Sequence, residues 1–235
     1  MAVMPLLATL VSAVFAWSLF RRYRESRRIH ALAWGISLTM YASASLALVF
    51  AEMNGWGPWL YRTFWLFGAL LNVPWLAAGS VSLAWPRLAR AAVLAMVVVS
   101  AYALVATVAA DPVSSVLARE EGIPLGRRSW PPGSNMLALV RVLSIGGWLA
   151  VVGIAFWTSR PHGGMRPPSA RVRANLLIAA GVTIVALGGF VLGRIGGTAV
   201  FSASLAVGVI VMYAGFLFAS KAPRYSVADP GDQAT

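Results

Sequence analysis

Seven charge-free runs of 18 to 23 residues divide this sequence of 235 residues, and they constrain its fold more than any other feature. A membrane-spanning helix needs about 20 apolar residues to cross a hydrocarbon core of about 30 Å. Such runs must be helical, because lipid offers no partner for a free backbone N–H or C=O, and their continuous apolar character excludes a closed β-barrel. We therefore predict an all-α, polytopic membrane protein with seven transmembrane helices. With the third and fifth runs extended at their starts, past Arg62 and Arg141, the predicted spans are residues 2–20, 31–51, 59–85, 91–110, 136–159, 174–193 and 198–220.

The composition supports one membrane domain. Charged residues make up 11% of the chain and hydrophobic residues 59%, whereas an average soluble domain is about a quarter charged. We assign residues 1–221 to a single transmembrane domain. Residues 222–235 have no apolar periodicity and are predicted to be a disordered tail. The first span is retained in this interpretation, since a signal peptide carries its positive segment before the apolar core and here the arginines follow it.

The distribution of basic residues predicts the orientation. Thirteen of the nineteen fall in the first, third and fifth connections and in the tail, and six fall on the other side. By the positive-inside rule, the N-terminus is outside the cell membrane and the C-terminus is cytoplasmic. The net charge of +12 is then mostly a collar that faces anionic lipid headgroups. We predict the lipid bilayer as a partner and no binding of nucleic acid, which requires a basic face with base-reading groups.

The spacing of the spans suggests an internal repeat. A shift of 140 positions brings Trp17 onto Trp157, Phe50 onto Phe190 and Gly68 onto Gly208. Helices 1–3 and 5–7 would then be parallel repeats with helix 4 as the inverting linker, a 3+1+3 arrangement. The alternative is that three evenly spaced spans always overlay on three others.

Two kinds of resemblance follow from this layout. Three helices, a linker and three more resemble the SWEET-type sugar transporters, and a seven-helix chain with its N-terminus outside resembles microbial rhodopsins. The motif residues of both families are missing, because Lys221 is the only lysine and follows the last helix, and because no Pro-Gln pair occurs. A third resemblance, to bacterial seven-helix membrane proteins, implies the fold and no activity. It rests on Trp56, Tyr61, Arg62, Trp65, Gly68, Pro74, Trp75, Leu76 and Gly79.

Three arginines from three different helices are the main candidates for a binding site. Arg62, Arg141 and Arg194 all lie near the predicted outer boundary, and such a cluster can hold a carboxylate or phosphate through paired N–H donors. Glu52 and Asp111 are the nearby acids. The alternative is that these arginines extend separately to the interface or form structural ion pairs.

Helix 3 and the long outer connection hold the other candidates. Pro74 cannot donate to the carbonyl of Leu70 and should kink the helix, and Asn72 either bonds the freed backbone or forms the polar wall of a cavity. Residues 111–134 are interpreted as a short helix and an extended segment across the outer mouth. They form either a solvated connector or a lid or docking surface.

The sequence points to binding rather than catalysis. It has no cysteine, only two histidines and no recognisable catalytic or metal-ligand set, so we predict no catalytic residue, metal or cofactor. We expect a receptor, sensor or accessory subunit that binds an anionic ligand, a lipid or a membrane-protein partner. A small-solute or lipid transporter is the alternative, and a membrane enzyme with an unfamiliar site is the third class.

Overall fold

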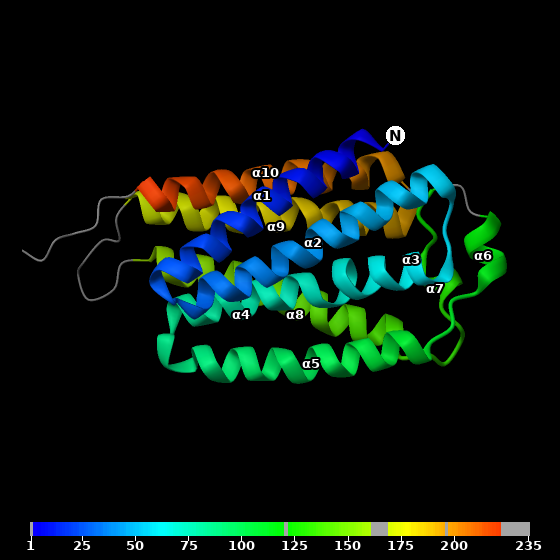
Figure 1. The fold of residues 1–235 in the computed structure, drawn as a ribbon, viewed down its shortest axis with the longest axis horizontal. Helices are drawn as coiled ribbons and strands as arrows, with labels where there is room; N and C mark the ends of the chain where they lie inside the picture. The colour runs from blue at the N-terminus through cyan, green and yellow to red at the C-terminus, as the bar shows by residue number, and fades with distance from the viewer. Residues whose placement is uncertain (1, 120–121, 161–168, 196, 222–235) are drawn as a thin grey trace, which may run out of the picture.

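The computed structural model describes residues 2–119, 122–160, 169–195 and 197–221, without side chains at 169–171, 192–195 and 219–221. Seven helices in this part of the chain are long and apolar enough to cross a membrane. They run side by side in one bundle (Figure 1). This confirms the predicted all-α fold of a multi-pass membrane protein; the predicted tail lies outside the described residues.

The third span is built from three segments, whereas the other six are single α-helices. The third comprises α3 (Pro58–Thr63), the π-helix η1 (Phe64–Leu71) and α4 (Asn72–Ala84). A 3₁₀ turn, η2 (Pro86–Leu88), precedes α5, and two short helices lie in the connection that follows α5, namely α6 (Ser114–Arg119) and α7 (Gly126–Ser129). The remaining spans are α1 (Val3–Ser26), α2 (Ile29–Asn54), α5 (Ala89–Ala109), α8 (Met136–Ser159), α9 (Ser169–Ile195) and α10 (Thr198–Lys221).

Local signals explain the tight turns between the first three spans. Arg27 adopts the left-handed conformation (φ 53°) and donates its N–H to the Tyr23 carbonyl, which ends α1 only two residues before α2 begins. Gly55 ends α2 with φ 81°, a value that favours glycine. Pro58 occupies the first turn of α3, where its missing N–H costs no helical hydrogen bond.

The helices form a closed ring with one helix outside it. In order around the ring lie α1, α2, the third span, α8, α9 and α10, and α10 returns to α1. α5 packs on the outside of α4. Large apolar side chains such as Val98 and Val142, each 69% exposed, cover α5 and α8. A surface of this kind is stable in lipid, so the protein is embedded in the bilayer.

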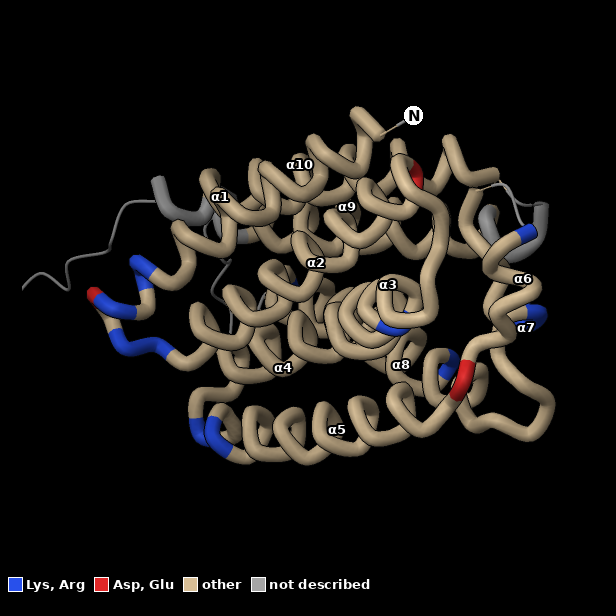
Figure 2. The backbone as a smooth tube through the Cα atoms, turned by 45° about the vertical axis from the view of Figure 1, so that its right-hand side comes forward, with Lys and Arg blue, Asp and Glu red and all other residues tan. Residues whose placement is uncertain are grey.

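The two ends of the bundle differ in charge and in covering. At one end, which we call the arginine end, lie the arginines of residues 21–28, in the last turn of α1 and the link to α2, and Arg87 and Arg90, in η2 and at the start of α5 (Figure 2). At the other end, which we call the roof end, lies the connection between α5 and α8. We call residues 122–130 of this connection the roof.

α9 and α10 make the closest helix contact, through paired glycines. A Cβ atom built on Gly181 would lie 2.5 Å from the Gly208 carbonyl oxygen, and one built on Gly208 would lie 2.8 Å from the Gly181 oxygen. Backbones can approach this closely only where neither residue has a side chain. α9 and α10 therefore form a rigid pair at one side of the bundle.

Candidate functional site

A cavity of about 650 Å³ lies inside the bundle and extends from the roof end past the middle of the spans. Its walls come from α2, η1, α4, α8, α9 and α10, and residues 123–127 of the roof cover it. One face of α8 contributes residues at helical spacing, including Leu137, Val140, Arg141 and Ser144. Most of the lining is apolar. The volume falls in the range of about 300–1,000 Å³ that is typical of small-molecule sites.

Aromatic residues hold the roof in place. Trp56 Nε1 donates to the Gly122 carbonyl at 2.6 Å, and the Tyr61 hydroxyl donates to the Pro124 carbonyl at 3.1 Å. The Trp130 ring packs on Tyr61 and Trp65, with centroids 5.5 and 5.7 Å apart. The connection is therefore a docked cover over the cavity.

Gly126 allows the roof to lie flat on the cavity wall. A Cβ atom at this position would come within 2.2 Å of the Trp65 ring. Trp65 lines the cavity and is 9% exposed, and its Nε1 has no hydrogen-bond partner among the described residues. The roof thus buries an indole N–H beside the cavity.

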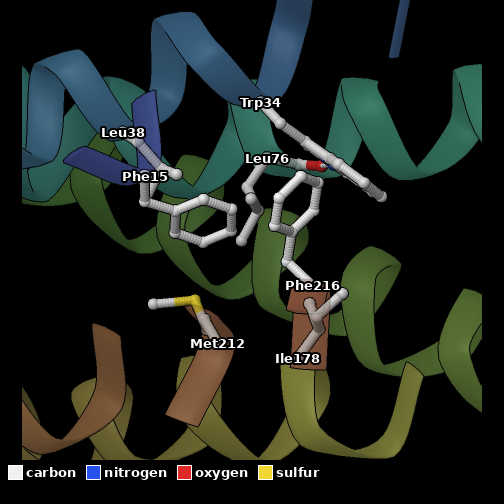
Figure 3. Close-up of a pocket in the computed structure, with 7 residues that line it drawn as sticks. All are labelled: Phe15, Trp34, Leu38, Leu76, Ile178, Met212 and Phe216. Atoms are coloured by element: carbon white, nitrogen blue, oxygen red, sulfur yellow. Dashed lines mark hydrogen bonds between the residues drawn. The ribbon is translucent and has the colours of Figure 1, made fainter. Parts of the chain in front are cut away.

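A cluster of large apolar side chains, which we call the plug, lies at the end of the cavity away from the roof. Figure 3 shows it, with Trp34 Nε1 donating to the Leu76 carbonyl at 3.0 Å. Leu38, Leu76 and Met212 belong both to the plug and to the cavity lining. The plug comprises Phe15, Trp34, Leu38, Leu76, Ile178, Met212 and Phe216, and it encloses only about 10 Å³.

The cavity opens sideways between α8 and α9. Ile145 on α8 is 55% exposed, and Leu187 and Phe190 on α9 are each 59% exposed, yet all three line the cavity. Towards the arginine end the two helices are joined by Trp148 Nε1, which donates to Thr183 Oγ1 at 3.1 Å, and by Asn175 Nδ2, which donates to Thr158 Oγ1 at 2.8 Å. We call the opening between these helices on the roof side of Trp148 the portal. It faces the hydrocarbon region.

The broken third span places polar groups in the cavity wall. Ser37 Oγ lies 2.8 Å from the Asn72 carbonyl oxygen and 2.7 Å from Asn72 Oδ1, and both residues are buried and line the cavity. Ser144 of α8 donates to the carbonyl of Ala69. In a π-helix an N–H donates to the carbonyl five residues earlier, so Pro74, which has no N–H, leaves the Ala69 carbonyl without a backbone donor. In an α-helix, the carbonyl without a donor would be that of Leu70.

Of the predicted site residues, Asn72 and Arg141 share the cavity. Arg127 also belongs to the lining, and the sequence placed it only in the connection. Its signal was weak, because an arginine in a loop points to a site only once the loop is known to cover a cavity. No carboxylate occurs among the described residues that line the cavity.

Arg62 has a separate structural role. It is 8% exposed, pairs with the Asp111 carboxylate, and donates to the carbonyls of Thr107 and Ala110 at 3.2 Å each. Its guanidinium also lies 4.8 Å from the centroid of the Trp59 ring. These contacts satisfy carbonyls at the C-terminal end of α5 and bind that helix to α3.

The remaining predicted residues lie away from the described lining. Glu52 is half-buried near the end of α2 and is not among the residues that line the cavity. The side chain of Arg194 lies outside the described part of the chain. A site shared by Arg62, Arg141 and Arg194 therefore stays a prediction, while the structure places Arg141 and Arg127 at one cavity.

In the described part of the chain, no three His, Asp or Glu residues lie close enough together to hold a metal ion. Comparison with protein-family models, with curated proteins and with solved structures gives no match.

Proposed function

We propose that this chain is a non-enzymatic membrane protein, a receptor, sensor or accessory subunit, whose cavity binds a chain-like apolar or amphiphilic molecule from the bilayer. The observation that carries the proposal is the cavity of about 650 Å³ with its portal between α8 and α9. The roof and the plug cover its two ends. A molecule already dissolved in lipid reaches such a site by moving sideways, without crossing an aqueous layer.

The test uses the full chain in phosphatidylcholine nanodiscs and a hexadecyl chain with a photoreactive diazirine at its methyl end, supplied as the alcohol and as the carboxylate. Crosslinks that excess unlabelled compound removes should map to lining residues such as Leu205 and Met212 of α10. Mass spectrometry of the labelled peptides locates them. Labelling by neither probe, or labelling spread evenly over lipid-facing positions, contradicts the proposal.

Two valines two positions apart on α8 provide the matched control. Val140 lines the cavity, so Val140→Trp fills it and should abolish the competed labelling. Val142 is 69% exposed on the lipid face, so Val142→Trp should leave the labelling intact. Equal labelling of the two variants would show that the probe binds elsewhere.

Transport of a lipid or small solute is the second candidate. It is favoured by the π-helix and Pro74, because backbone that departs from the α-helix at membrane depth is tolerated where it lines a cavity. The test is movement of a fluorescent lipid between leaflets of proteoliposomes. Movement that exceeds protein-free vesicles and is lost in Val140→Trp supports transport, and a rate equal to that of empty vesicles supports binding alone.

The orientation and the repeat also belong to the proposal. The arginine end is proposed to face the cytoplasm, and the roof end the outside. Because the chain has no cysteine, single cysteines can be introduced at Pro132 and Ser26, which are exposed at opposite ends. An impermeant reagent added outside should label the first and spare the second. The 3+1+3 repeat stays a prediction.

A further inference from the structure

The cavity has two chemically different ends, which restricts what it can hold. Arg127 of the roof and Arg141 of α8 line it at the roof end. Leu38, Leu76 and Met212 line it at the plug. We propose that the occupant is an amphiphile with one anionic head group, a carboxylate or a phosphate, held at Arg127 and Arg141, and an apolar chain that runs to the plug. This inference rests on the proposed function.

The arginines are placed to meet a head group at the membrane boundary. Arg141 lies five residues into α8, or about 7.5 Å along the helix at 1.5 Å per residue. The first turn of α8 lies against the roof, since a Cβ on Gly126 would be 3.4 Å from Leu137 Cδ2. Two arginines from different segments, both of them exposed, therefore belong to the lining at the end of the cavity closest to the interface.

No described residue of the cavity lining neutralises the positive charge of Arg127 and Arg141. The Asp111 carboxylate is engaged by Arg62, and no described lining residue is acidic. A guanidinium presents several N–H donors in a plane and binds carboxylate or phosphate oxygens in pairs. An anionic head group would supply the negative charge that no described lining residue offers to Arg127 and Arg141.

The length of the cavity fits one leaflet of a bilayer. Phe201 and Met212 both line it on α10, and eleven residues of α-helix span about 16.5 Å. Half of a hydrocarbon core of about 30 Å is about 15 Å. A chain of leaflet length therefore reaches the plug while its head group stays level with the arginines.

The portal allows this molecule to enter without moving its charge through hydrocarbon. The opening extends in the direction of the proposed apolar chain and is flanked by Ile145, Leu187 and Phe190. The apolar chain passes between α8 and α9, and the head group slides along the interface beneath the roof. This route explains an apolar, lipid-facing opening next to a basic end.

The experiment measures competition for the diazirine–hexadecyl carboxylate label in the nanodiscs described above. Unlabelled palmitate or hexadecyl phosphate should compete about tenfold or more better than hexadecanol, since a charge-assisted hydrogen bond contributes about 1.5–3 kcal/mol and 1.4 kcal/mol is tenfold. The better of the two anions identifies the head group. Equal competition by hexadecanol overturns the anionic assignment and leaves the proposed function intact.

Charge-neutral variants complete the test. Arg127→Gln with Arg141→Gln should remove the preference for anions while hexadecanol competes as before. Arg119→Gln removes a charge from α6, outside the described lining, and should keep the preference. Retention of the preference in the double variant overturns the assignment of these arginines. If inorganic phosphate alone displaces the label at millimolar concentration, the occupant is not an amphiphile. If the wild-type protein shows no labelling that unlabelled compound removes, the proposed function itself is overturned.

Discussion

Trp148 on α8 donates its indole N–H to the hydroxyl of Thr183 on α9 at 3.1 Å, and this bond marks the edge of the portal. Both residues line the cavity, so the bond connects helix packing directly to ligand access. The bond is part-buried between two helices whose further separation would widen the opening.

Thr183→Val keeps the shape of the side chain and removes the hydrogen bond. We expect a loss of about 0.6–1.7 kcal/mol in the free energy of unfolding, the size of measured interhelical bonds in membranes. The dissociation rate of a bound chain should rise as the portal loosens. Thr39→Val is the control, because the Thr39 hydroxyl bonds only the Gly35 carbonyl of its own helix. Detergent-titrated unfolding and probe dissociation measure the two effects, and equal behaviour of both variants contradicts the role of the bond.

A double-mutant cycle tests how the broken third span is held. Ser144→Ala leaves the Ala69 carbonyl without its donor and should cost about 1–3 kcal/mol in unfolding free energy. In a Pro74→Ala background the cost should shrink, because residue 74 then has an N–H to offer. Ser82→Ala is the control, since its hydroxyl bonds the Ala78 carbonyl within the same helix. Equal costs of Ser144→Ala in both backgrounds would show that Ser144 does not compensate for Pro74.

Arg62 and Arg21 form ion pairs in opposite environments. Arg62→Gln should lower the unfolding free energy by about 1.5–3 kcal/mol, because it removes a charged donor from two carbonyls and from Asp111. Arg21→Gln should cost about 0–1 kcal/mol, because its pair with Glu25 is exposed. Arg62→Lys should not restore stability, since an ammonium lacks the planar set of donors. Full rescue by lysine would contradict this account.

Two glycines of α9 provide a test of helix packing. Gly181→Ala places a methyl group 2.5 Å from the Gly208 carbonyl oxygen and should cost about 1–3 kcal/mol by overpacking. Gly189→Ala is the control, because its nearest neighbour, Phe201 Cε2, would lie at an ordinary 3.8 Å. Thermal unfolding midpoints in one detergent give the comparison. A Gly181→Ala midpoint equal to that of the control contradicts the close contact.

The sequence alone was sufficient to predict the number and the position of the membrane-spanning helices. Span length follows from bilayer thickness, and the apolar runs are long enough to exclude other folds. The kink expected at Pro74 stays a prediction; the structure shows a π-helix before this proline, and donors from neighbouring helices, Ser37 and Ser144, satisfy carbonyls there. Such donors are contributed by tertiary packing, which a single sequence does not reveal.

The candidate site was predictable only in part. Asn72 and Arg141 attract attention because polar residues are rare inside spans, and both line the cavity. The partner of Arg62 was not settled by spacing, because Glu52 and Asp111 were both within reach, and the contact of α3 with the end of α5 selected Asp111. The position of Arg127 at the cavity depends on the packing of Gly126 in the roof against Trp65, a contact between segments about sixty residues apart.

The plug limits how water can be arranged beyond the cavity. Its interior space of about 10 Å³ is at the lower limit for a single water molecule, which needs about 10–15 Å³. Among the described residues, the space between these seven side chains is therefore too small for a file of waters that could pass protons along it.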